Sequence, residues 1–234
     1  MTASGDRALM RLHVETLFTH DARGDLVAVN EPDGRPAPRF FLGVTTGERI
    51  IRCRYDVELE TRSALQSLLE AELPDAYWTG PSTRLKQYEA ALARSAPVQR
   101  TWAGPAFSFP PELPAVSKAL PVTSRNSSIL QPFLGAWIQD VQSAQPMFAA
   151  TVDDIAVAVC CSVRRTGQAH EAGAETAPSY RGRGYAGAAV TAWATAVRAL
   201  GIVPLYSTSW SNEASRALAR KLTLRHFGSD LHIT

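Results

Sequence analysis

Three consecutive segments in the second half of the chain are short, largely apolar and separated by turn residues. They run from Met147 to Val152, from Ile155 to Arg164 and from Ala169 to Ala177, with Asp153-Asp154 in the first turn and Gly167 in the second. Segments of this kind predict β-strands, and strands joined by short connections pair antiparallel. We therefore expect an antiparallel meander of three strands.

Apolar residues after the meander recur at helical spacing. A stripe between Ala186 and Leu200 predicts a helix from about Tyr185 to Leu200, which Gly201 is suited to end. The neighbouring segments predict, in chain order, a weak strand, a helix, a strand, a helix and a last strand: Ala115 to Val122, Ile129 to Val141, Val203 to Ser209, Asn212 to Leu222 and Leu224 to Ile233.

The first half of the chain mixes short helices with a hairpin. Two segments, Arg39 to Thr46 and Arg49 to Asp56, flank Gly47-Glu48 and predict the hairpin. Two helices follow, one carrying the leucines from Leu65 to Leu73 and one beginning near Pro81. Proline recurs between 97 and 114, so we expect an irregular linker there. Three aromatic residues either line a pocket or clamp this linker to the core: Trp102, Phe107 and Phe109.

This order of elements predicts an α/β (α+β) fold, a mixed and mostly antiparallel sheet flanked by helices, with an extra α/β region at the N-terminus. The 234 residues suffice for one or two domains. We expect residues 1–110 to form an N-terminal region to which the sequence assigns no role, and residues 115–234 to form a second domain.

Composition excludes several function classes. The net charge of +2 leaves no electrostatic footprint for nucleic acid, and the longest apolar run, Ile155 to Cys161, is too short to span a membrane. Three cysteines form no CxxC pair and no two histidines have metal-ligand spacing, so we expect a soluble, cytoplasmic protein without a metal. All but three of the 24 basic residues are arginine, a skew that we attribute to codon bias.

A glycine-rich turn between a strand and a helix is the most informative segment. It runs from Pro178 to Gly187 and includes Arg181, Gly182, Arg183 and Gly184. The first turn of a helix has free N–H groups and the positive end of the helix dipole, and glycine lets the backbone approach a ligand closely. With two arginines adding charge, the turn predicts a phosphate ligand.

Two phosphate-binding families use such a turn. The three glycines at 182, 184 and 187 match G-x-G-x-x-G, but no acidic residue lies between Thr176 and Asn212, and too few residues follow for a dinucleotide fold. The run Arg181-x-x-Gly184-x-Ala186 instead resembles R/Q-x-x-G-x-G/A, the pyrophosphate motif of the GNAT superfamily of acyl-CoA-dependent N-acetyltransferases. The preceding Pro178-x-Tyr180-Arg181 and the helix after Asn212 also resemble that family, over about residues 115–234.

The resemblance implies acetyl-CoA as co-substrate and direct attack by an amine. In this family two central strands splay apart around the pantetheine arm. The backbone of Ala174, Glu175 and Thr176 is expected to pair with the arm, with Asn212 and Ser215 contacting it from the other side. The pyrophosphate is expected on backbone N–H groups of the turn: Arg181, Gly182, Arg183, Gly184, Tyr185 and Ala186.

Candidate proton-transfer residues lie near this predicted site. Glu171 and Glu175 share a strand face, Gly173 between them is expected to keep that face open, and either carboxylate is a candidate general base. His170 is an alternative base on the opposite face. The family's usual tyrosine in the last helix falls at Ala219 here, so Tyr206 is a candidate acid, beside the hydroxyls of Ser207, Ser209 and Ser211. Thr223 replaces the usual glycine after that helix, so we expect the turn to differ.

These residues predict a bacterial N-acetyltransferase acting on a primary amine of a small molecule or peptide, with no nucleic-acid or membrane partner. A non-catalytic acyl-CoA-binding regulatory protein is the alternative, because the usual tyrosine is missing. A homodimer is left open, and the sequence does not identify the acceptor.

Overall fold

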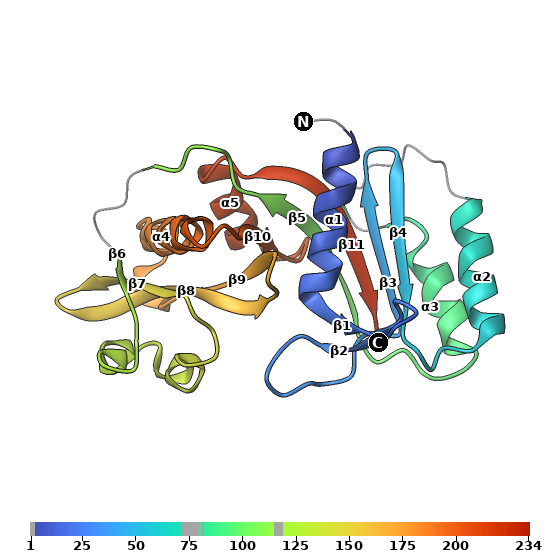
Figure 1. The fold of residues 1–234 in the computed structure, drawn as a ribbon, viewed down its shortest axis with the longest axis horizontal. Coiled ribbons are helices and arrows are strands. Elements are labelled where there is room, and N and C mark those ends of the chain that lie inside the picture. The colour runs from blue at the N-terminus through green and yellow to red at the C-terminus, as the bar shows by residue number, and fades with distance from the viewer. Residues whose placement is uncertain (1–2, 72–79, 81, 115–118) are drawn as a thin grey trace. The chain divides into compact units, whose positions relative to one another are not determined.

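The computed structural model describes residues 3–71, 80, 82–114 and 119–234 (Figure 1). Our predictions at Leu73, at Pro81 and over 115–118 lie outside these ranges. The helices, strands and 3-10 helices (η) are, in chain order, α1 (Ala3–Leu17), β1 (Phe18–His20), β2 (Leu26–Val29), β3 (Phe40–Thr45), β4 (Glu48–Cys53), α2 (Leu59–Glu70), α3 (Leu85–Ala93), β5 (Thr101–Ser108), β6 (Ala119–Pro121), η1 (Ser127–Leu130), η2 (Gly135–Asp140), β7 (Met147–Val152), β8 (Ile155–Arg165), β9 (Ala169–Thr176), η3 (Pro178–Tyr180), α4 (Tyr185–Ala199), β10 (Val203–Ser207), α5 (Glu213–Lys221) and β11 (Arg225–Ile233).

The chain forms two compact units, which we describe separately. The first comprises Met1–Phe107, Ser207–Glu213 and His226–Thr234, and the second comprises Ser108–Tyr206 and Ala214–Arg225. Strands of the first unit follow the order β4-β3-β11-β5, beside a separate β1-β2 pair, and strands of the second follow the order β10-β9-β8-β7-β6. Of the pairs in the second order, β10–β9 is parallel and the others are antiparallel. The predicted fold class is confirmed.

The sheet of the first unit is buried on both faces. Alternate residues of β3 point to opposite sides. Phe40, Leu42 and Val44 pack with residues of α2 and α3 in one apolar cluster. On the other side, a Cβ atom on Gly43 would lie 2.6 Å from Met10 of α1, so glycine leaves room for this helix to pack closely.

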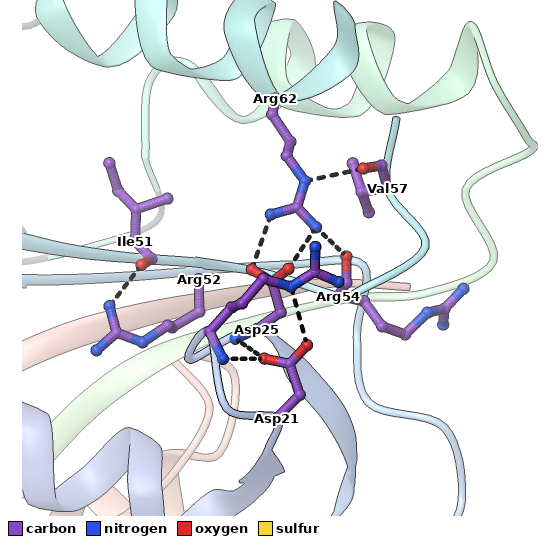
Figure 2. A network of polar contacts seen from close by, with 8 residues as sticks. Asp21, Asp25, Ile51, Arg52, Arg54, Val57 and Arg62 are labelled. Atoms are coloured by element: carbon purple, nitrogen blue, oxygen red, sulfur yellow. Dashed lines mark hydrogen bonds and ion pairs between the residues drawn. The ribbon is translucent and has the colours of Figure 1, made fainter. Parts of the chain in front are cut away.

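Two arginines of the first unit donate hydrogen bonds from their guanidinium groups to other residues of the protein. Figure 2 shows Arg62, whose two NH groups donate to the two carboxylate oxygens of Asp25 at 2.8 and 2.9 Å. Arg39 is buried and donates to three main-chain carbonyls, those of Leu92, Ala96 and Pro97. These guanidinium groups therefore satisfy backbone and carboxylate acceptors and do not form a phosphate-binding surface.

The second unit confirms the predicted meander and the helix after it. Strands β7, β8 and β9 fall on the expected segments, and Asp153 and Asp154 form the first turn with φ of 49° and 61°. Helix α4 packs against β7, β8 and β9 (Figure 1). Its Trp193 is fully buried. The opposite face is covered by the apolar side chains around η1 and η2.

The prediction of one helix over Ile129 to Val141 is wrong. The segment instead contains two short 3-10 helices, η1 and η2, separated by Pro132. Proline has no N–H to donate and disfavours helical backbone at the preceding residue, so the apolar spacing is present without a continuous helix. The side chains of Leu130 and Leu134 are buried and face the core.

The prediction of an irregular linker over 97–114 is also wrong in part, because β5 runs through Pro105. The carbonyl of Pro105 accepts a hydrogen bond from Thr208 N–H at 3.3 Å, so this proline still takes part in main-chain bonding. All three aromatic residues contact other rings, Trp102 with His232 at 4.6 Å, Phe107 with His226 at 5.4 Å and Phe109 with Trp193 at 5.9 Å between ring centres.

No helix within the described ranges is long and apolar enough to cross a membrane.

Candidate functional site

Two neighbouring strands of the second unit separate part-way along their length. β9 and β10 are paired in parallel over only three positions, from Ala169 opposite Val203 to Glu171 opposite Leu205. β9 continues to Thr176, and over this stretch its register is with β8. Backbone beyond Glu171 on the β10 side is therefore available to an extended ligand.

The glycine-rich turn follows directly at the end of β9 and leads into α4. Gly182 and Gly184 have φ of 76° and 90°, a left-handed conformation that L side chains rarely adopt. Gly184 is the N-cap residue of α4, and no side chain caps this helix. The first N–H groups of α4 therefore lack side-chain acceptors, as an anion-binding helix terminus requires.

The two arginines of the turn contact protein groups. Arg181 donates from Nε to the carbonyl of Thr176 at 3.3 Å, and the Arg183 guanidinium lies 5.5 Å from the ring centre of Tyr180. Tyr180 also contacts Tyr185 and Phe133, at 6.0 and 5.5 Å between ring centres. Side chains of the turn thus contact one another and stabilise it. The left-handed backbone conformations occur at its two glycines.

The two candidate glutamates on β9 have different surroundings. Register with β8 places them on one face, but Glu171 is 3% exposed whereas Glu175 is exposed. Trp137 of η2 donates its indole N–H to Glu175 Oε2 at 2.6 Å. Gly173 does not keep this face open as expected, because a Cβ there would lie 2.1 Å from Val163, whose side chain fills the space.

His170 is buried on the other side of the sheet. The Trp193 N–H donates to Ser162 Oγ at 3.0 Å, and Ser162 Oγ lies 2.9 Å from His170 Nδ1. Burial, with a contribution from the positive charge of Arg165, lowers the pKa of His170. This histidine is therefore tied into the core beneath α4.

Tyr206 and Ser215 form a hydroxyl pair between β10 and α5. Their oxygens lie 2.6 Å apart, and Tyr206 is 4% exposed. Burial raises the pKa of Tyr206 to about 12, and the hydrogen bond with Ser215 offsets part of this. The phenol therefore keeps its proton at neutral pH.

The structure also describes Asn212 and the two adjacent cysteines. Asn212 belongs to the first unit, where its N–H donates to the carbonyl of Ser209 at 3.0 Å. Cys160 and Cys161 are buried, which raises the pKa of both thiols, so they are poor nucleophiles. In the described part of the chain, no group of His, Cys, Asp and Glu is suited to hold a metal ion.

Comparison with known proteins assigns one segment of the chain to a family. A model of the GNAT acetyltransferase family matches residues 118–228. The chain therefore carries a GNAT acetyltransferase domain, which covers just under half of its length. A search of curated proteins found no match.

Several solved GNAT structures resemble the chain. An acetyltransferase of the GNAT family from Novosphingobium aromaticivorans has a TM-score of 0.49 and 19% identity, over 58% of this chain and 65% of that one. A GNAT acetyltransferase from Colwellia psychrerythraea has a TM-score of 0.49 and 13% identity, over 86% of this chain and 82% of that one. A GCN5-related N-acetyltransferase-like protein from Streptococcus suis has the same TM-score and identity, over 85% of each chain. This chain thus spans just under two thirds of the Novosphingobium chain.

Two departures from the GNAT pattern can now be described. Ala219, at the position of the usual tyrosine, is fully buried. Thr223 has a φ of 52°, within the left-handed region that favours glycine. Threonine there adopts a backbone conformation typical of glycine, and our expectation that the turn differs from the family's stays a prediction.

Two residues near the glycine-rich turn and Glu175 were not found from the sequence. Trp137 contacts a glutamate 38 positions away, which no local pattern indicates. Lys221 Nζ lies 3.6 Å from the position that a Cβ atom would occupy on Gly184. Only the packing of α5 beside α4 brings this lysine to the glycine-rich turn, so its location requires the tertiary structure.

Proposed function

We propose that this GNAT protein is an N-acetyltransferase that transfers the acetyl group of acetyl-CoA directly to a primary amine. The observation that carries the proposal is the continuity of three features. β9 separates from β10 after Glu171, β9 ends at a turn with two left-handed glycines, and the turn opens an uncapped helix. An extended arm ending in a pyrophosphate fits this sequence of backbone groups.

The donor site is proposed to consist mainly of backbone. Ala174 and Thr176 would pair with the pantetheine arm, and an N–H near Thr176 would stabilise the oxyanion that develops on the thioester carbonyl. Backbone N–H groups from Arg181 through Gly182, Arg183, Gly184 and Tyr185 to Ala186 would bind the pyrophosphate. Ser215 is proposed as a further contact to the arm, and the contact expected of Asn212 stays a prediction from the sequence.

The acceptor amine is protonated at neutral pH, so it must become neutral before it can attack the thioester. Glu175 is the better placed of the two candidate bases, because its carboxylate is exposed while Glu171 is buried. The Trp137 N–H holds one carboxylate oxygen of Glu175, which leaves the other to accept the amine proton directly or through water. In the proposed reaction the N–C bond forms first, which gives an oxyanion on the carbonyl, and collapse of this adduct breaks the C–S bond and releases the thiolate.

The leaving thiolate takes up a proton at the end of the reaction. Tyr206 is the proposed donor, with Ser215 orienting its hydroxyl. Its raised pKa of about 12 makes it a weak acid, so solvent can compete with it as the proton source.

Wild-type protein should bind acetyl-CoA and use it. At a ligand concentration of 100 times Kd, linkage adds about 2.7 kcal/mol, which corresponds to a rise in Tm of about 5–10 °C for a chain of this size. A thermal-shift titration measures binding, and thiol release across a panel of primary amines measures turnover. No shift at millimolar acetyl-CoA overturns the proposal, and a shift with no turnover of any amine supports the non-catalytic alternative.

Glu175→Gln should lower kcat/KM for the amine by about 100-fold, the lower range for losing a general base, while acetyl-CoA binding is unchanged. Glu171→Gln should have a smaller effect, since that carboxylate is buried. Asp154→Asn, in the exposed turn after β7, is the matched control for losing a carboxylate from the second unit. If both glutamate variants keep wild-type turnover from pH 6 to 9, neither is the base.

A further inference from the structure

The glycine-rich turn has a third cation beside it, which comes from a different element. Helix α5 packs along the first turns of α4, where a Cβ on Gly187 would lie 3.8 Å from Leu218 and 3.7 Å from Leu222. Lys221 lies on the same helix, and its Nζ is 3.6 Å from the Cβ position on Gly184. The ammonium group is therefore in van der Waals range of the residue that caps α4.

The arginines of the turn do not fill the same role. Arg181 is tied by Nε to the Thr176 carbonyl, and Arg183 stacks over Tyr180. Both guanidinium groups thus stabilise the turn from the side of β9 and η3. Lys221 approaches from α5, next to the left-handed Gly184 at the start of α4.

The charge of Lys221 is not neutralised by the protein. It forms no ion pair with any residue in the described ranges, and no acidic residue occurs between Thr176 and Asn212 in the sequence. Its neighbour in the last turn of α5 is another cation, Arg220. An exposed ammonium beside uncapped helical N–H groups is suited to a phosphate, to which lysine binds as a point charge.

We propose that Lys221 of α5, rather than Arg181 or Arg183, supplies the side-chain charge that binds the pyrophosphate of the acyl donor. The inference rests on the proposed function, because it assumes an acyl-CoA on the glycine-rich turn. It assigns a donor-binding role to α5, outside the turn that carries the sequence motif. It also gives a specific role to one of only three lysines in the chain.

Calorimetric titration of three donors tests this assignment. Acetyl-CoA carries the pyrophosphate and the 3′-phosphate, 3′-dephospho-acetyl-CoA keeps only the pyrophosphate, and S-acetylpantetheine has neither. Lys221→Gln should weaken the first two about threefold to tenfold, as expected for one partly exposed ion pair, and leave the third unchanged. The difference should shrink at high salt, because exposed charges are screened, and Lys221→Arg should restore most of the affinity.

Arg220→Gln is the matched control, since it removes the adjacent exposed cation of the same helix and should leave all three affinities unchanged. Equal binding of acetyl-CoA by wild type and Lys221→Gln overturns the role assigned to Lys221 and leaves the proposed function intact. An equal loss with S-acetylpantetheine overturns it in favour of a structural role, and a loss confined to acetyl-CoA moves the lysine to the 3′-phosphate. Failure of wild type to bind acetyl-CoA overturns the proposed function and this inference with it.

Discussion

Gly184→Glu is expected to abolish the stabilisation of the protein by acetyl-CoA. Gly184 has a φ of 90°, so any side chain strains the first turn of α4 by about 1 kcal/mol. The larger effect is electrostatic, because the new carboxylate would lie beside Lys221 and the uncapped N–H groups. It would occupy the anion site and repel a pyrophosphate, so we expect affinity to fall by at least about 100-fold, or 2.7 kcal/mol.

The opposite end of the same helix provides the control for this substitution. Gly201 follows α4 with a φ of 75°, and a Cβ there meets nothing within 4 Å. Gly201→Glu therefore imposes a similar backbone strain and the same charge, away from the turn. It should lower Tm modestly and keep the acetyl-CoA shift. If Gly184→Glu binds acetyl-CoA as well as Gly201→Glu does, the turn is not the pyrophosphate site.

The sequence predicted best where local signals agreed with each other. The meander, its Asp153-Asp154 turn, and α4 with Gly201 after it combine apolar segments with turn residues, and the structure confirms them. It misled where a single signal was considered alone. The apolar spacing over Ile129 to Val141 predicted one helix because Pro132 was not taken into account. The prolines around Pro105 predicted an irregular linker where the structure has a strand.

The candidate site was predictable only as far as it is made of consecutive residues. The glycine-rich turn is a continuous segment, so its conformation at Gly182 and Gly184 could be expected from residue type. Contacts that depend on the packing of distant segments could not be predicted from the sequence. Trp137 reaches Glu175 because the segment after Pro132 covers the face of β9, and Lys221 reaches Gly184 because α5 packs on α4.

A buried charge cluster in the first unit had no sequence signal either. Asp230 of β11 is fully buried, opposite Gly43 of β3. Its Oδ2 atom lies 2.6 Å from His232 Nε2 and 3.5 Å from Nε2 of His13 on α1. Burial alone would raise the pKa of Asp230, but the two histidines lower it to about 2, so the carboxylate is ionised in the folded protein.

Asp230→Asn is therefore expected to destabilise the protein at neutral pH. A pKa of about 2 in the folded state, against 3.8 as the ordinary value, corresponds to about 2 kcal/mol, and removing one member of a buried charged group raises this to about 3 kcal/mol. Because the folded-state pKa is the lower one, this stabilisation is present above pH 4 and lost as the pH falls toward 2. The difference between wild type and variant in urea unfolding should therefore narrow over that range.

The same Asp→Asn substitution at an exposed ion pair shows how much of the effect on stability depends on burial of the charge. Asp56 accepts from Arg54 at 2.7 Å, and its side chain is 46% exposed. Exposed pairs contribute only about 0–1 kcal/mol, so Asp56→Asn should change stability little at pH 7. If Asp230→Asn is equally mild, or if its deficit stays constant between pH 4 and pH 2, the two histidines do not hold Asp230 ionised.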